Sequence, residues 1–348
     1  MAVITWTEKF PAGLMQRYWY ANASDADGTN LICAFTNGRV YISIDSGATW
    51  NETFPAGAAN KNWRSVASDS TGQYLAACAV GGRIYTTANG GGLWTERTPD
   101  GANDRDWASV AINSDGSAII LCEAYGIFAP NRGRVWLSTD YGATWNDMQP
   151  SGNVSWGWTS VDIDSDGSFL IACASFYHRL YTSSNGGALW TERTPDGAVD
   201  KLWNCVACDD DGSTLIVGSG FDALHPNGRL WTSSNGGANW TERQPAGNVD
   251  KTWYTVRSNN SGSVLIAAAH GGRVYHSDDS GAIWNETQPI GAANGYWRSV
   301  DCDDSGTRFI INRGSGAFSG GIYIGDHPLG GGYKRLVNYS RRKTLIGR

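Results

Sequence analysis

The sequence predicts an all-β fold in which seven four-stranded units close into a ring, a seven-bladed β-propeller, and three observations lead to this prediction. Pairs of tryptophans with a constant spacing of 13 residues recur seven times, and successive pairs lie 44 to 51 residues apart. Each interval contains four short strand-like runs joined by Gly-rich turns, as expected for an all-β array. The last interval lacks its final tryptophan, and an unmatched one lies near the N-terminus. Four strands in a unit of about 45 residues match a propeller blade.

The paired tryptophans account for 14 of the 17 tryptophans, so the repeat covers most of the chain. They are Trp6 and Trp19, Trp50 and Trp63, Trp94 and Trp107, Trp145 and Trp158, Trp190 and Trp203, Trp240 and Trp253, and Trp284 and Trp297. A repeat of this size cannot bury its apolar face alone, so each unit must stack on its neighbours.

Six hairpins share the pattern Ser/Thr-x-Asp/Asn-x-Gly-x-x-Trp, which we call the turn motif. An Asp or Asn side chain can accept hydrogen bonds from the backbone of its own turn, the Gly permits a positive φ, and the Trp covers the turn with an apolar face. The Asp or Asn positions are Asp45, Asn89, Asp140, Asn185, Asn235 and Asp279. Each copy predicts a hairpin between the third and fourth strands of a unit.

The N-terminal residues are predicted to close the ring. The seventh unit runs past Tyr323 without a further tryptophan, whereas residues 4–11 match the fourth strand of the other units. The N-terminal strand would therefore complete the last blade and remove the free sheet edges. The propeller then spans residues 1–332, and a basic tail, Tyr333–Arg348, leaves it.

Charge is unevenly distributed along the chain. The net charge is −6, yet the last 16 residues hold six Lys and Arg residues and no acid, which leaves 21 basic against 33 acidic residues elsewhere. A body this acidic argues against non-specific nucleic-acid binding. No apolar run is long enough for a membrane span, and no secretory signal is visible at the start. An extracellular surface or a virion is favoured over the cytoplasm.

The turn motif resembles the Asp box of the BNR-repeat, sialidase-like propellers found in sialidases, xyloglucanases, sortilins and photosystem II assembly factors. The resemblance covers the chain to about residue 330 and implies the propeller fold. Three copies carry Asn where the family has Asp, which fits a structural role for the motif. The resemblance implies no single activity, because the same blades serve hydrolases, receptors and lectin-like binders.

The resemblance also implies which loops form a binding face. In these propellers the turn motifs lie on one face, and the connections between blades and between second and third strands lie on the other. In units three to five these loops depart from the repeat and carry aromatic residues, which suit stacking on a sugar. The ligand-binding residues predicted there are Trp156, Tyr125, Phe128, Phe176, Tyr177, His178, Phe221 and His225. The alternative is that these rings pack within their own loops.

A second candidate site is a ring of arginines, one from each of six units, that could attract an anion. These are Arg39, Arg83, Arg134, Arg179, Arg229 and Arg273. The alternative is structural: each arginine donates to carbonyls of a neighbouring loop or stacks on a tryptophan, and its presence in nearly every unit favours this interpretation.

Catalysis is not favoured. A glycosidase needs two carboxyl groups about 5–10 Å apart, and nothing in the sequence pairs Glu123 with Asp222. The family's sialidase features, an Arg-Ile-Pro segment and a Tyr/Glu nucleophile pair, are absent. No cofactor is expected, and no metal: the EF-hand-like run Asp162, Asp164 and Asp166 lacks its final bidentate Glu.

Three functions remain open. The first is a non-catalytic binding or adhesion module, with a glycan as ligand. The second is a structural or assembly component, such as a virion or surface protein, that binds other proteins and docks through Tyr333–Arg348. The third is a sialidase-like glycoside hydrolase.

Overall fold

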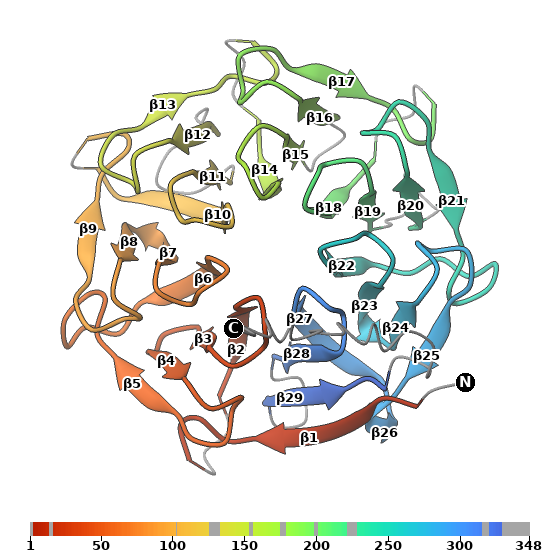
Figure 1. Ribbon diagram of the computed structural model, residues 1–348, viewed down its shortest axis with the longest axis horizontal. Coiled ribbons are helices and arrows are strands. Elements are labelled where there is room, and N and C mark those ends of the chain that lie inside the picture. Colours follow the sequence, from red (N-terminus) through yellow and green to blue (C-terminus); the bar gives the residue numbers. More distant parts are fainter. Residues whose placement is uncertain are drawn as a thin grey trace, which may run out of the picture.

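Seven blades surround a central channel in the computed structural model (Figure 1), which describes residues 3–13, 17–101, 103–124, 133–152, 156–174, 179–197, 201–220, 228–314 and 320–328. Each blade is an antiparallel sheet whose first strand lines the channel and whose fourth lies on the rim. The predicted fold class is confirmed.

The strands follow the order predicted from the repeat. Blade 1 contains β2 (Trp19–Ser24), β3 (Leu31–Phe35), β4 (Val40–Ser43) and β5 (Asn51–Thr53). Blade 2 contains β6 (Asn62–Ser68), β7 (Leu75–Gly82), β8 (Ile84–Thr87) and β9 (Thr95–Arg97). Blade 3 contains β10 (Arg105–Ile112), β11 (Ile119–Glu123), β12 (Val135–Ser138) and β13 (Asn146–Asp147). Blade 4 contains β14 (Trp158–Ile163), β15 (Leu170–Ala174), β16 (Leu180–Ser183) and β17 (Thr191–Arg193).

The later blades keep this order until the ring closes. Blade 5 contains β18 (Trp203–Cys208), β19 (Leu215–Ser219), β20 (Leu230–Ser233) and β21 (Thr241–Arg243). Blade 6 contains β22 (Trp253–Ser258), β23 (Leu265–Gly272), β24 (Val274–Ser277) and β25 (Asn285–Thr287). A short strand, β26 (Pro289–Ala292), precedes blade 7, which contains β27 (Gly295–Cys302), β28 (Arg308–Arg313), β29 (Gly321–Asp326) and the N-terminal β1 (Thr5–Lys9).

Ring closure occurs as the sequence predicts. β1 pairs antiparallel with β29, with Thr5 opposite Asp326 and Lys9 opposite Ile322 (Figure 1). The indole Nε1 of Trp6 donates a hydrogen bond of 2.6 Å to Thr287 Oγ1 in blade 6. Because β1 covers the outer edge of β29, blade 7 has no free third strand.

The hydrophobic core lies between blades rather than within them. The second tryptophan of each pair starts the first strand of a blade and is 1–3% exposed. Trp63, for example, packs against Ile32 and Val40 of blade 1, and its Nε1 donates to the Gly38 carbonyl of that blade at 3.0 Å. Each blade therefore depends on its neighbour for burial, which is why the ring must close.

A ring of backbone hydrogen bonds connects all seven blades on the face that carries the turn motifs. Each bond joins the turn after one first strand to the same turn of the next blade, with N···O distances of 2.9–3.2 Å. The residues, in donor-to-acceptor order, are Ala26, Ser70, Ser114, Ser165, Asp210, Asn260 and Asp304, whose N–H donates back to Ala26. The sequence contains one such residue per unit, but only the closed ring pairs them.

The turn motif forms the predicted local hydrogen bonds. In blade 1, Ser43 Oγ donates to Asp45 Oδ1 at 2.8 Å and accepts from the Gly47 N–H at 2.8 Å. Gly47 has a φ of 77°, so an L-residue would be strained there. In blade 2, Asn89 Oδ1 accepts from Thr87 Oγ1 at 2.8 Å and from the Leu93 N–H of the same turn at 2.8 Å. Asn and Asp thus support the same turn.

Candidate binding site at the channel mouth

The channel mouth opposite the turn motifs is lined by the residue that follows the second tryptophan in each unit. In an antiparallel four-stranded blade, the first strand begins on the face opposite the hairpin between the third and fourth strands. These lining residues are Tyr20, Arg64, Ala108, Thr159, Asn204, Tyr254 and Arg298. In every unit a tryptophan precedes this position and a small residue follows it, but the residue at the position itself varies. Each blade therefore contributes a different side chain to the mouth.

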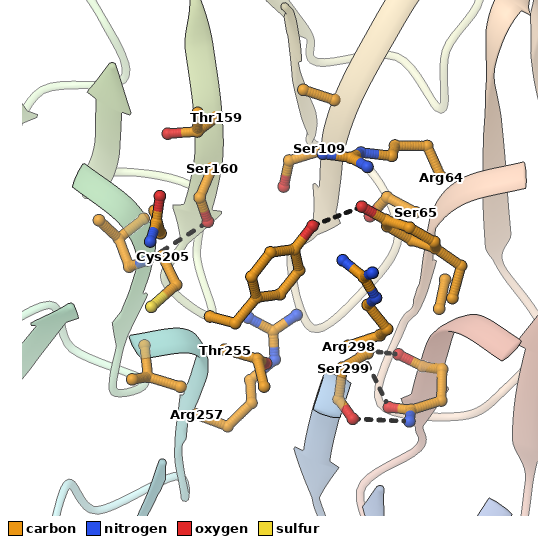
Figure 2. A pocket seen from close by; sticks show the side chains of 18 of the residues that line it. Arg64, Ser65, Ser109, Thr159, Ser160, Cys205, Thr255, Arg257, Arg298 and Ser299 are labelled. Carbon is orange, nitrogen blue, oxygen red and sulfur yellow. Dashed lines mark hydrogen bonds between the residues drawn. The ribbon is translucent and has the colours of Figure 1, made fainter. Parts of the chain in front are cut away.

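Tyrosines and arginines cluster on one side of this mouth, over blades 1, 2, 6 and 7. The guanidinium carbon of Arg298 lies 5.3 Å from the Tyr20 ring centroid and 4.9 Å from that of Tyr254. The guanidinium carbon of Arg64 also lies over the Tyr20 ring, 4.4 Å from its centroid. The two phenol oxygens of Tyr20 and Tyr254 lie 2.5 Å apart. Figure 2 shows both guanidinium groups reaching into the channel, Arg64 from β6 and Arg298 from β27.

These two arginines have no carboxylate partner among the described residues. Arg298 donates one hydrogen bond, from Nη2 to Tyr18 Oη at 2.9 Å, and its buried Nε has no partner within the described ranges. Burial and the Arg298 charge lower the pKa of His270, which lies beside Tyr254. The mouth is therefore positively charged, lined with aromatic rings and partly exposed. We call Tyr18, Tyr20, Arg64, Tyr254 and Arg298 the arginine–tyrosine mouth.

Below the mouth, hydroxyl groups link neighbouring first strands. Ser65 Oγ accepts from the Val110 N–H of the next blade at 3.2 Å, and Thr255 Oγ1 accepts from Val300 at 3.1 Å. Ser160 makes the equivalent bond to blade 5. These hydroxyls serve the assembly of the ring and are already hydrogen-bonded.

Deeper in the channel, Arg257 lies between two acids. Its Nε is 3.1 Å from Asp301 Oδ1, and Asp162 lies on the other side of the channel, accepting from the Cys208 N–H at 3.0 Å. Burial raises the pKa of both carboxyls, and Arg257 opposes that rise. Burial disfavours the Arg257 charge, but the two acids raise its pKa overall. This cation is compensated internally, unlike the two at the mouth.

The opposite mouth is acidic. Asp210 and Asp304 line it beside the backbone ring. Burial, with the charges of Asp304 and Asp209, raises the pKa of Asp210 from 3.8 to about 6. The channel therefore has a basic, aromatic end and an acidic end, and an anion would be attracted to the first and repelled from the second.

Of the aromatic residues predicted to bind ligand, only Trp156 lies within the described residues. Its ring is partly buried, 5.9 Å from the Trp158 centroid and 5.5 Å from that of Tyr181. Trp156 thus packs on β14 and β16 of blade 4, and its role in ligand binding stays a prediction. Outside the described residues lie Tyr125, Phe128, Phe176, Tyr177, His178, Phe221, His225 and the tail Tyr333–Arg348.

The six repeated arginines immediately precede the third strands of their blades, away from the first strands that line the channel. Each faces a carboxylate 13 residues later on the fourth strand, at 3.2–4.0 Å. The pairs are Arg39–Glu52, Arg83–Glu96, Arg134–Asp147, Arg179–Glu192, Arg229–Glu242 and Arg273–Glu286. Arg83 and Arg229 each reach a second acid, and Arg39 and Arg273 donate to loop carbonyls. Anion binding by this ring stays a prediction, and the structural alternative has these contacts in its support.

The acids considered for other chemistry also have internal partners. Glu123 is 2% exposed and accepts from Trp136 Nε1 at 2.9 Å, and burial raises its pKa. Asp222 lies outside the described residues. Asp164 and Asp166 accept hydrogen bonds from Ser168 within their own turn.

Sequence reasoning missed the arginine–tyrosine mouth because it compared loop lengths rather than single repeat positions. The signal was present: the residue after the second tryptophan is Tyr, Arg, Ala, Thr, Asn, Tyr and Arg along the chain, whereas a serine, threonine, cysteine or alanine follows it in every unit.

Solved structures with the same fold include two YCF48 structures and a GH74 xyloglucanase. "YCF48 bound to D1 peptide" is 13% identical, with a TM-score of 0.65, over 93% of this chain and 97% of that one. YCF48 from Cyanidioschyzon merolae is 14% identical, with a TM-score of 0.66, over 94% and 99%. The GH74 xyloglucanase from Xanthomonas campestris is 17% identical, with a TM-score of 0.67, over 92% of this chain and 53% of that one.

The chain is a β-propeller. At these identities the likeness establishes the fold alone, and this chain spans about half of the xyloglucanase. No protein-family model and no curated protein sequence matches the chain. Within the described residues, no helix has the length and apolar character to span a membrane.

Proposed function

We propose that this protein is a non-catalytic binding module that receives an acidic segment of a partner protein at the arginine–tyrosine mouth. The observation that carries the proposal is the contrast in charge pairing. The six repeated arginines each face a carboxylate of their own blade, whereas Arg64 and Arg298 face tyrosine rings. Arg64 and Arg298 lie at a concave surface without a carboxylate partner from the described residues, so they can bind a carboxylate of a ligand.

The tyrosines preorganise this site by holding the arginine side chains in place. Arg298 stacks among three phenol rings, and Arg64 lies on one of them. A guanidinium held in this way loses little conformational freedom when it binds. Tyrosine rings also give a peptide large, rigid contact area, which is why they are frequent in binding surfaces. The peptide-bound YCF48 structure has the same fold, which is compatible with a protein ligand.

A glycan remains the second candidate, because the tyrosine faces of the same mouth can stack on the C–H face of a sugar. Trp156 is partly buried against Trp158 and Tyr181, which weakens the hypothesis that the loops of blades three to five bind the glycan. We also infer that the six turns are Asp boxes of the BNR-repeat type, on the hydrogen bonds that Asp45 and Asn89 form.

The proposal is tested with fluorescent peptides that carry several Asp and Glu residues, compared with isosteric peptides that carry Asn and Gln. The full-length protein should bind the acidic set more tightly, and added salt should weaken that binding. Arg298→Gln should reduce affinity by about 10-fold or more, because a hydrogen bond to a charged group contributes about 1.5–3 kcal/mol. Arg298→Lys keeps the charge and should lose less.

Two results would count against this function. Equal affinity for acidic and neutral peptides would remove the role of charge. Binding on a glycan array that Trp156→Ala abolishes and Arg298→Gln leaves unchanged would place the ligand on the loops and favour the glycan.

A further inference from the structure

Three side chains with metal-ligand chemistry meet where the ring closes. The metal-binding atoms of His276, Asp278 and His327 all lie within 4.8 Å of one another. His276 lies in β24 of blade 6, Asp278 follows that strand in the turn motif, and His327 follows β29 of blade 7. His327 Nε2 is 3.5 Å from Asp278 Oδ1, and the two imidazole centroids are 5.1 Å apart.

Each of the three residues departs from its repeat position. Other blades place Ile42, Thr86, Leu137, Thr182, Thr232 and Ile324 where blade 6 has His276. The other turn motifs have Ile44, Ala88, Thr139, Ser184 and Ser234 where that of blade 6 has Asp278, and blade 7, which lacks the motif, has Asp326 at this position. The register of β29 aligns Ile322 with Ile84 of blade 2, which puts His327 at the Asp or Asn position of a turn motif that blade 7 lacks. Three independent departures thus converge at one point.

Three of the four imidazole nitrogens in this cluster are buried without a hydrogen bond among the described residues. Both histidines are 3% exposed, and Nδ1 of His276 and both ring nitrogens of His327 have no hydrogen bond within the described part of the chain. On one side lies the buried ring of Phe309, 5.9 Å from His327, which offers no polar atom. Buried polar nitrogens of this kind cost stability unless something satisfies them. A bound cation would do so directly.

We infer that His276, Asp278 and His327 form a zinc site at the seam of the propeller. Two neutral imidazoles and one carboxylate are ligands that Zn²⁺ favours, whereas Ca²⁺ and Mg²⁺ prefer oxygen alone. Zn–N and Zn–O bonds of about 2.0–2.2 Å need the ligand atoms roughly 3.3–3.5 Å apart, so a small side-chain movement completes the set.

The site has a structural role that follows from its place. In four of the six blades that carry a turn motif, the motif glycine packs on the third strand of the blade before it, as Gly281 does against Thr232. In the other two, Gly187 and Gly237 contact Met148 and Arg193, which lie on or just after the fourth strand of the blade before. Blade 7 has no turn motif after β29, so a metal bridging His327 to blade 6 would supply that connection. This inference does not depend on the ligand of the channel mouth.

The test uses the full-length, tag-free protein after removal of metal with a chelator. Calorimetric titration should give one Zn²⁺ per chain, and saturating Zn²⁺ should raise the melting temperature, since a ligand that binds only the folded state stabilises it. Co²⁺ should bind competitively and give the visible absorption of a tetrahedral site.

Substitution by the residue of another blade gives variants that should still fold. His276→Thr, Asp278→Ser and His327→Asn each copy the same position elsewhere in the repeat. Each should weaken Zn²⁺ binding by more than about 10-fold, because even outer-shell partners of a metal change affinity by 10–100-fold. His270→Asn, outside the cluster, should bind Zn²⁺ like the wild type. Absence of zinc binding by the wild type, or equal binding by the three variants, would overturn the inference.

Discussion

The arginines that recur at the start of the third strands each face a carboxylate of their own blade, whereas Arg64 and Arg298 face tyrosine rings at an open mouth. The same contrast holds for histidine at the seam, where His276 replaces the Thr or aliphatic residue of other blades. Repeated positions are satisfied within the fold. Where a blade has a residue that most other blades lack, the described residues leave the side chain partly unpaired: Arg64 and Arg298 have no carboxylate partner, and His276 Nδ1 has no hydrogen bond. This is expected where a sequence departs from its repeat for the sake of function.

If repeated strands carry the fold, loss of the closing strand should have the largest effect. Deletion of residues 1–10 removes β1, exposes the edge of β29 and frees Thr287 from Trp6. We expect aggregation or a large fall in melting temperature, because the outer edge of β29 becomes available for pairing with other chains. Deletion of residues 1–3 alone is the control, since β1 begins at Thr5. A monomeric protein with an unchanged melt after the longer deletion would refute ring closure by β1.

Within the repeat, the two tryptophans of a pair should differ. Trp107 is 2% exposed and donates to the Gly82 carbonyl of the preceding blade at 3.1 Å. Trp145 is only partly buried and bonds its own turn at Gly142. Trp107→Ala should lower the free energy of unfolding by about 3–5 kcal/mol, the range for a buried large aromatic, and Trp145→Ala by clearly less. Denaturant unfolding measures both, and equal losses would contradict the inter-blade core.

Asp210, at the acidic end of the channel, should lower the stability of the protein in a pH-dependent way. The pKa of Asp210 is raised to about 6, above its ordinary 3.8, so the folded state holds this proton more tightly than the unfolded state. Stability should therefore fall as pH rises from about 4 to about 6. Asp210→Asn, which copies Asn260 of blade 6, should melt higher than the wild type at pH 7 and equally at pH 4. A variant that melts lower at pH 7 would contradict this account.

The smallest effect on stability is expected from a substitution at the Asp or Asn position of the turn motif, because both residues already occur there. The Asp45 carboxylate accepts from the Thr49 N–H at 2.7 Å, and Asn89 makes the equivalent bond in blade 2. Asp45→Asn should leave the melting temperature at pH 7 nearly unchanged. Hydrogen bonds from Thr49 and Ser43 lower the pKa of Asp45 to about 2, so wild type should lose stability between about pH 4 and 2, and the variant should not. Unfolding of the variant at pH 7 would show that the turn needs the charge.

The blades and their closure could be predicted from the sequence because the spacing of the tryptophans indicates both. The 13-residue tryptophan interval sets blade geometry, and the orphan Trp6 identifies the closing strand. The mouth and the seam were not predicted, and the reason is physical: Arg64 and Arg298 become neighbours only in the closed ring, and His276 and His327 meet only when blades 6 and 7 pack together. No metal was expected because the EF-hand-like run from Asp162 to Asp166 lacks its final bidentate Glu. The pair His276 and Asp278 does not reveal its third partner, His327, which lies in the next blade.

The most direct test compares two double variants for both binding and stability. Arg64→Gln with Arg298→Gln alters the mouth, and Arg83→Gln with Arg273→Gln removes two repeated, carboxylate-paired arginines. The account predicts that the mouth variant loses the acidic peptide by well over 10-fold while its melting temperature changes little. The repeat variant should bind as the wild type does and melt at a lower temperature. Retained binding by the mouth variant, or loss of binding by a folded repeat variant, would contradict the claim that the departing positions carry the function.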